Sequence, residues 1–312
     1  MPRKPVPCRP VPAYQCWAAY ISAFFWGVLV WETSIEEESF WLLFKLTCVC
    51  TIVIWLFSIL NNNSSIYDPY WVLAPPFLAL AAKSTSGLDN FHSRQIAILL
   101  CFVSWSCRYH FFYPWAGWWT GLKHEDWRYE DMRSDSILPY WLNSLLGMHM
   151  FPTVLVFFAF APACLVMLRS PADQPAWGSL WDYLGLFGAL SAVVIQYFAD
   201  EQMRIFRIGK MYKTGGTLHS GLWKFSRHPN YFGEALFWIT MIPFSLSTGD
   251  AAAFPKLCYI GPNAMFFFFR FSSTLMDARS LKHRPGYKRV MDEVSCMVPW
   301  PRRRESAMIH QS

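Results

Sequence analysis

Long apolar runs alternate with short polar segments along most of this chain. A helix needs roughly 20 apolar residues to cross a bilayer. Runs that reach or approach this length lie at residues 16–32, 40–60, 71–83, 96–114, 138–168, 178–199, 231–247 and 254–275. Pro152 predicts a kink in the longest run, and Pro243 predicts a short or tilted helix. The pattern indicates an all-α membrane bundle of seven to eight transmembrane helices.

Composition supports this reading. Of the 312 residues, 54% are hydrophobic and 15% charged, against about 25% charged in an average soluble domain. The formal net charge is +6, but the basic residues lie between apolar runs rather than on one polar domain, so no nucleic-acid partner is expected. The first run is long and no small-residue cleavage site follows it, so no cleavable signal peptide is expected.

The distribution of Lys and Arg predicts the orientation, because cytosolic loops carry the excess. If eight helices alternate from a cytosolic N-terminus, 20 of the 27 basic residues fall on the cytosolic side. The cytosolic segments are then 1–15, 61–70, 115–137, 200–229 and 277–312. The opposite side receives few basic residues and the acidic run at 36–38. Both termini are expected in the cytosol, and the endoplasmic reticulum is the expected membrane.

The nine cysteines lie mostly in or beside apolar stretches, where they act as small hydrophobic residues. No C-x-x-C pair and no Cys/His cluster at zinc spacing is present. No metal site is expected.

Segment 198–212 carries the first candidate site. As a helix, it places Asp200, Arg204 and Arg207 at positions i, i+4 and i+7, along one face. Arg207 is suited to gripping a phosphate, because its planar guanidinium can donate two hydrogen bonds. The alternative is a solvated helix end on which Asp200 simply pairs with an arginine.

The stretch RHPNYFGE is the second candidate site. Pro229 pushes His228 towards extended backbone and is favoured at the first helical position, so a helix is expected to begin at Pro229. The free N–H groups of its first turn favour an anion at the cytosolic mouth. Glu234 follows in apolar surroundings, and an ionisable residue within a span indicates function. The alternative is that Glu234 pairs with a nearby arginine such as Arg227.

The C-terminal stretch holds the third candidate site. Arg279 and His283 are four residues apart and share a helical face, which Pro285 then breaks before Tyr287. The alternative is contact with lipid headgroups, and the arginine run at 302–304 fits that reading better still.

Two apolar runs nearer the N-terminus carry buried polar residues. Asp68 lies at the mouth of the short run 71–83, and Arg108 and Tyr109 lie deep in the next one. Burying Arg108 is costly unless it is paired, and Asp68 is the expected partner. Tyr109 beside a cation is a candidate hydrogen-bond or proton donor to a bound oxygen. The alternative is a purely structural Arg–Asp tie between helices.

These motifs resemble the steroid 5-alpha-reductase C-terminal superfamily, in particular its DUF1295 branch. The strongest match is GLWKFSRHPNYFGEALFW. Further matches are IYDPYWVLAPP, RQIAILLCFVSWSCRY, EDWRYEDMR, FADEQMRIF and an ending with Tyr287, Pro299 and Trp300. Families that share this fold include sterol reductases and isoprenylcysteine and phospholipid methyltransferases.

The resemblance implies a helical bundle that holds NADPH in a cytosol-facing cavity, without a Rossmann domain. It matches an Asp-to-Arg step to Asp200 and Arg207, and an Asn-Tyr-x-Gly-Glu core to the stretch from Asn230 to Glu234. The candidate cofactor contacts are Asp200, Arg204, Arg207, Arg227, His228, Asn230, Tyr231, Glu234, Arg279, His283 and Tyr287. The steroid reductases also use a carboxylate and a tyrosine to polarise an enone carbonyl, and the nearest counterparts are Asp68 and Tyr109.

The resemblance therefore implies an NADPH-dependent reductase of a C=C bond in a lipid-like substrate such as a sterol, steroid or isoprenoid. One alternative is a SAM-dependent membrane methyltransferase, although this chain has Asp277 and Ala278 where those enzymes carry a glutamate pair. Another is a non-catalytic scaffold in a membrane complex. The expected regions are a cytosolic tail, a substrate-side helical region, a cofactor-binding region and a basic tail, at 1–15, 16–175, 176–301 and 302–312.

Overall fold

The computed structural model describes residues 9–34, 39–112, 117–135, 138–249, 257–284 and 286–303. The acidic run at 36–38, Pro285 and Arg304 lie outside these ranges. Regular structure in the described part is helical except for one short antiparallel pair, β1 (Val11–Pro12) with β2 (Gly121–Leu122). The expected all-α fold is confirmed.

Each predicted apolar run forms a helix or a pair of consecutive helices. The long helices are α1 (Ala13–Thr33), α2 (Ser39–Asn61), α3 (Tyr67–Ser84), α4 (Ser93–Phe111), α7 (Phe151–Leu168), α8 (Leu180–Ile208) and α12 (Leu257–His283). The shorter ones are α5 (Trp127–Asp135), α6 (Tyr140–Asn143), α9 (Lys210–Lys213), α10 (Pro229–Ile239), α11 (Met241–Leu246) and α13 (Tyr287–Glu293). Four helical stretches in the described residues are long and apolar enough to cross a membrane: 13–33, 39–61, 140–168 and 180–208.

Pro152 and Pro243 lie beside interruptions of their helices, as expected, whereas Pro75, Pro76, Pro162 and Pro262 lie within continuous helices. A π-helical turn, Ser144–Met150, joins α6 to α7 immediately before Pro152. The run that contains Pro243 divides into α10 and α11 three residues before the proline. Proline has no N–H to donate and its ring crowds the preceding turn, so regular α-helical hydrogen bonding is broken on its N-terminal side.

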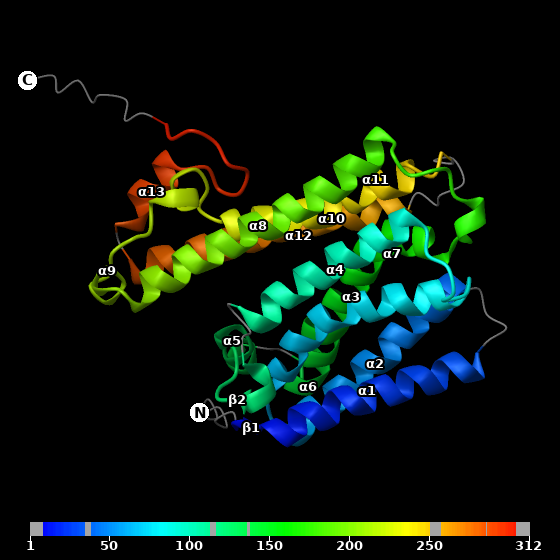
Figure 1. Cartoon of the computed structure of the whole chain (residues 1–312). Coiled ribbons are helices and arrows are strands. Elements are labelled where there is room, and N and C mark those ends of the chain that lie inside the picture. Colours follow the sequence, from blue (N-terminus) through cyan, green and yellow to red (C-terminus); the bar gives the residue numbers. More distant parts are fainter. Residues whose placement is uncertain are drawn as a thin grey trace, which may run out of the picture.

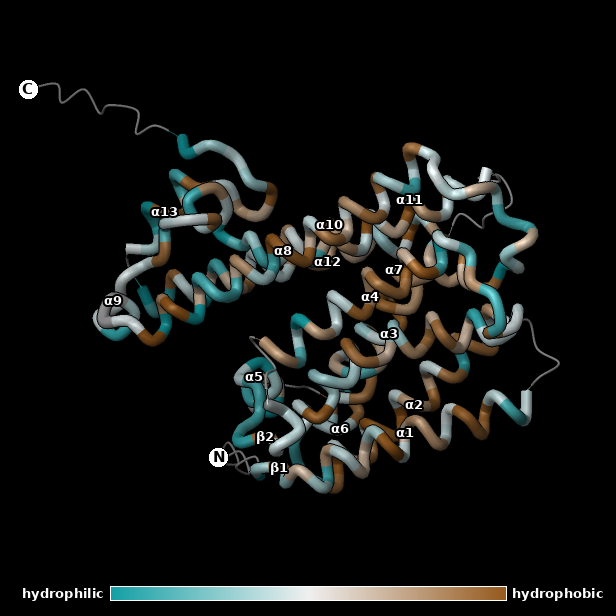
Figure 2. Tube along the Cα trace, in the orientation of Figure 1, coloured by the Kyte–Doolittle hydropathy of each residue, from teal (hydrophilic) through white to brown (hydrophobic). Residues whose placement is uncertain are grey.

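The helices run back and forth between two ends of the molecule (Figure 1). The N-terminus, β2, α5, α9 and α13 lie at one end, together with the last turns of α4, α8 and α12. We call this the basic end, because the segments predicted to be cytosolic meet there. The most polar segments of the trace also gather towards this end, whereas apolar residues dominate the middle of the bundle (Figure 2).

A buried ion pair ties α4 to α8 at the opposite end. Arg94 donates from Nε to Asp182 Oδ1 at 2.6 Å and from Nη2 to Oδ2 at 3.1 Å, and both side chains are fully buried. Gln174 accepts a further hydrogen bond from Arg94 at 3.2 Å. Because two short bonds with planar geometry hold these side chains, the pair sets how α4 lies along α8.

Candidate functional site

A network of charged side chains lies inside the bundle, where α4, α8 and α10 meet. Arg108 on α4 donates from Nη1 to Asp200 Oδ2 on α8 at 2.5 Å, and the two side chains are 3% and 9% exposed. Asn230 on α10 donates to the other Asp200 oxygen at 3.2 Å. The expectation that Asp68 pairs with Arg108 is wrong, because helix packing turns Arg108 towards α8.

Glu234 is the second carboxylate of this network. It accepts hydrogen bonds from the indole N–H groups of Trp105 and Trp238, at 3.1 and 2.9 Å, and from the Tyr109 hydroxyl at 2.9 Å. Arg108 lies 3.8 Å away. Glu234 is 1% exposed, so these donors replace the water that its carboxylate loses on burial. The alternative partner, Arg227, bonds elsewhere.

Local sequence explains how these side chains meet. Trp105, Arg108 and Tyr109 are spaced i, i+3 and i+4 on α4, so they share one face. On α10, Asn230 and Glu234 are one turn apart, on a helix that begins at Pro229 as expected. Gly233 between them lets α10 approach α8 closely, since a Cβ there would lie 2.6 Å from Gln196 Cγ.

Two groups in the network have unused hydrogen-bonding capacity. Arg108 Nε and both amide atoms of Gln196 are buried and have no hydrogen-bond partner among the described residues. A buried polar atom without a partner is costly, so such atoms favour a bound polar group or an ordered water. Arg108 Nε and the Gln196 amide are therefore the buried polar atoms at which a water or a polar group would restore a lost hydrogen bond.

Asp68 lies in the first turn of α3 and has a different partner from the one expected. The Tyr129 hydroxyl on α5 donates to Asp68 Oδ1 at 2.5 Å. Burial raises the pKa of Asp68 to about 7, although the nearby positive charge of Arg128 opposes this rise. Asp68 is thus a candidate neutral acid near physiological pH.

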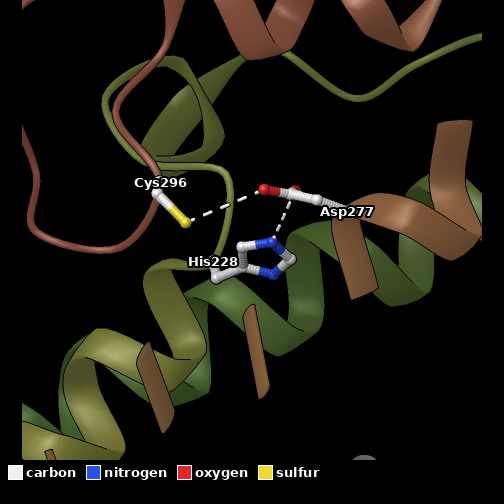
Figure 3. Close-up of side chains that lie close together, drawn as sticks. All are labelled: His228, Asp277 and Cys296. Carbon is white, nitrogen blue, oxygen red and sulfur yellow. Dashed lines mark hydrogen bonds and ion pairs between the residues drawn. The ribbon is translucent and has the colours of Figure 1, made fainter. Parts of the chain in front are cut away.

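Asp277 on α12 is the centre of a third group, at the basic end. It accepts from Arg227 Nη2 and His228 Nε2, both at 2.8 Å, and from the Tyr287 hydroxyl at 2.6 Å. Burial alone would raise the pKa of Asp277, but the hydrogen bonds from His228 and Arg227 outweigh it and lower the pKa. Figure 3 shows that His228 and Cys296 both point towards the Asp277 carboxylate.

The Asp277 group fastens the C-terminal segment to the RHPNY stretch. Arg227 also donates to the carbonyl oxygens of Met291 and Val294. His228, Asp277 and Cys296 place ligand-type atoms within 4.8 Å of one another. The carboxylate already receives a guanidinium, however, and a metal ion would have to displace that charge. This favours a structural anchor over a metal centre.

The remaining basic candidates lie on the surface of the basic end. Arg204 pairs with Glu201 at 2.6 Å, and Arg207 and His283 are exposed. Arg279 lies over the Trp127 ring, 3.5 Å from its centroid, and 3.6 Å from Asp131. These side chains are more accessible to solvent than that of Arg227, which is 10% exposed.

The amino-acid sequence of this chain was compared with those of known protein families. A family described as "protein of unknown function (DUF1295)" matches residues 54–294. This chain belongs to the DUF1295 family. An uncharacterised protein of Schizosaccharomyces pombe is 24% identical over 273 residues, which cover 79% of this chain and 76% of the yeast protein. No solved structure matches.

The DUF1295 region contains every candidate site residue, from Asp68 to Tyr287, whereas α1 precedes it. The sequence analysis assigned no site role to Asp277, Tyr129, Trp105 or Trp238. Asp277 could have been identified from the sequence, because it is an acidic residue that lies between an apolar run and a strongly basic stretch. Tyr129 stands inside the quoted motif EDWRYEDMR, although nothing in the sequence pointed to its partner.

Proposed function

We propose that this DUF1295 protein is a membrane-embedded, NADPH-dependent reductase of a C=C bond in a lipid-like substrate such as a sterol, steroid or isoprenoid. Its seven to eight helices cross the endoplasmic reticulum membrane with the basic end in the cytosol. The observation that carries the proposal is the charged network of Arg108, Asp200 and Glu234 inside an apolar bundle. Such buried charges are expensive in a membrane and mark functional sites.

The residues at the basic end fit the cofactor. Arg204, Arg207, Arg279 and His283 are partly or fully exposed, which suits several phosphates. Arg204 and Arg207 lie one and two turns beyond Asp200 on α8, so this helix joins these two surface arginines to the buried network. The unpartnered Arg108 Nε and Gln196 amide would take polar groups of a ligand that reaches inwards.

Arg227, His228 and Tyr287 have another role in this proposal. Their donors are taken by Asp277, so they hold the RHPNY stretch in place rather than contact a phosphate directly. Tyr231 packs against the same unit, with its ring 5.5 Å from the His228 ring. These residues position Asn230 and Glu234, which face the network.

NADPH, when bound, supplies the hydride, and the protein supplies placement and electrostatics. Arg108 offsets part of the negative charge of Asp200 and Glu234. An acid near the substrate stabilises the charge that develops on a carbonyl conjugated to the double bond. Asp68 and Tyr109 are the acids proposed for this step from the sequence, and each now has its own partner.

The main alternative, a SAM-dependent methyltransferase, finds less support. Those enzymes carry a glutamate pair where this chain has Asp277 and Ala278. Here Asp277 is 3% exposed and already bonded to three side chains. A lipid substrate and surrounding membrane lipids are the partners of the proposed enzyme, and a further membrane-complex partner belongs to the scaffold alternative.

Cofactor binding by the detergent-purified full-length protein tests the proposal. NADPH, NADH and SAM are compared with the wild type and with Arg207→Ala and Arg279→Ala. Loss of one charged hydrogen bond predicts NADPH binding weaker by roughly 10- to 100-fold in each variant. Arg289→Ala is the matched control, because it removes an exposed arginine that pairs with Glu293 on α13.

Binding of SAM without NADPH would replace the reductase with a methyltransferase. Binding of none of the three by well-folded protein would favour the scaffold. If Arg289→Ala weakened NADPH binding as much as the two test variants do, the result would show only a general effect of positive charge.

A further inference from the structure

The short helix α5 joins two long helices at the basic end. On one side, the Tyr129 hydroxyl donates to Asp68 of α3 at 2.5 Å. On the other side, the ring of Trp127 lies under the guanidinium of Arg279, on the second-last turn of α12. Trp127 is thus the side chain through which α5 reaches a candidate cofactor contact.

The backbone around Trp127 is held by buried contacts. Glu125 is 2% exposed and accepts a hydrogen bond from the Ser64 N–H at 2.5 Å. The Asp126 N–H donates to Ser65 Oγ at 2.8 Å. Because the two residues before Trp127 are fixed to the segment that precedes α3, the indole ring has a defined place at the basic end.

Arg279 lies on the face of this ring. Its guanidinium carbon is 3.5 Å from the ring centroid, which is contact distance for a cation on an aromatic face. A guanidinium carries its N–H donors in its own plane, so stacking on a ring leaves them for hydrogen bonds. The Arg279 side chain is 39% exposed, and among the described residues none accepts a hydrogen bond from it.

Asp131 is the other neighbour of Arg279. Its Oδ2 lies 3.6 Å from Arg279 Nη1, which is too long for a hydrogen bond, and its side chain is 64% exposed. An exposed ion pair of this kind contributes little, because water and salt screen it. The aromatic face of Trp127 is therefore the stronger restraint on the direction of the guanidinium.

We propose that Trp127 is a positioning residue that holds Arg279 ready for a phosphate of the bound dinucleotide. This inference rests on the proposed reductase for the nature of the ligand. A guanidinium that is already oriented loses less conformational freedom when it pairs with a phosphate. Trp127 thus strengthens binding through Arg279 without touching the ligand itself.

The test measures binding of two probes, NADPH and inorganic pyrophosphate, to detergent-purified full-length protein by calorimetry. Trp127→Leu should weaken the binding of both by about 3- to 10-fold, as loss of a partly exposed cation–π contact predicts. Trp127→Phe keeps an aromatic face, so it should recover most of this loss and also guards against a folding defect in Trp127→Leu.

A double-mutant cycle shows whether Trp127 acts through Arg279. If it does, adding Trp127→Leu to Arg279→Ala should weaken binding no further, because the side chain that Trp127 orients is already absent. Losses that multiply in the double variant would show that the two residues act independently, and would overturn the inference.

Tyr212→Leu is the matched control. Arg284 lies over the Tyr212 ring, 4.8 Å from its centroid, so this variant removes another arginine–aromatic contact outside the candidate site. It should leave the binding of both probes unchanged, and a loss equal to that in Trp127→Leu would overturn the inference. Weaker binding in Asp131→Asn would do so as well, because it would make Asp131 the residue that orients Arg279.

The two probes separate this inference from the proposed function. Pyrophosphate binding that depends on Trp127, found without NADPH binding, would reject the reductase and leave the phosphate site standing. NADPH binding that is weakened in Arg279→Ala but unchanged in Trp127→Leu would keep the reductase and reject the role of Trp127. Binding of neither probe would overturn both.

Discussion

Asp277→Asn tests how the RHPNY stretch is held at the basic end. The carboxylate accepts from Arg227, His228 and Tyr287 at 2.8, 2.8 and 2.6 Å. Asparagine keeps one acceptor oxygen and loses the negative charge. The Arg227 side chain, 10% exposed, then lacks a counter-charge in a place where water does not replace it.

The magnitude follows from the two kinds of contact that Arg227 makes. Breaking a buried ion pair by removing one partner costs about 3–5 kcal/mol. The carbonyls of Met291 and Val294 still accept from Arg227 and offset roughly 1 kcal/mol of this. A net cost of about 2–4 kcal/mol raises the equilibrium constant for opening of the C-terminal segment by roughly 30- to 700-fold.

Hydrogen exchange measures this opening directly. The Arg227 and Trp300 amides donate to the carbonyls of Ser295 and Phe225, so both report when the segment separates from the RHPNY stretch. Asp292→Asn is the control, since its exposed pair with Lys288 is worth about 0.5 kcal/mol or less. If exchange in Asp277→Asn matched the control, the anchoring role of Asp277 would be refuted.

Three further outcomes follow from other contacts. Arg94→Met should destabilise the protein by about 3–5 kcal/mol, because Asp182 is left fully buried without its counter-charge. The melting temperature in detergent should fall, and an unchanged melting temperature would contradict this. Asp68 has a folded-state pKa of about 7, above its unfolded value of 3.8, so the folded protein takes up a proton as the pH falls below about 7 and gains stability. Thermal melts at pH 8 and pH 5 should show a larger gain in the wild type than in Asp68→Asn, and an equal gain in both would contradict this. Gly233→Ala should lower the free energy of unfolding by about 1–3 kcal/mol, since the new Cβ would lie 2.6 Å from Gln196 Cγ. Denaturation of the variant and the wild type under identical conditions checks this. Equal stability would mean that α8 and α10 are not in close contact there.

Local features of the fold were predictable from the sequence. Pro229 marked the start of α10, and α12 ends at His283, two residues before Pro285. Both depend on proline, whose effect on the backbone involves only its near neighbours. The π-helical turn before Pro152 shows the same dependence, although its geometry was not specified by the pattern.

The partners of charged residues were not predictable in the same way. Arg108 was expected to pair with Asp68, and it pairs with Asp200, 92 residues away in sequence. Candidate residues that the sequence grouped together also separate in space. Arg227 and His228 belong to the anchor on Asp277, whereas Asn230 bonds to Asp200 in the network.

The sequence by itself determined that this chain is helical, that several of its helices are long and apolar enough to cross a membrane, and where these helices lie. These properties depend on the length and polarity of each run, which act locally. Only the tertiary structure decided that Arg108 meets Asp200, that Tyr129 meets Asp68 and that Asp277 gathers the C-terminal donors. Each of these contacts depends on how one helix is rotated against another, and that rotation is set by the packing of whole helix faces.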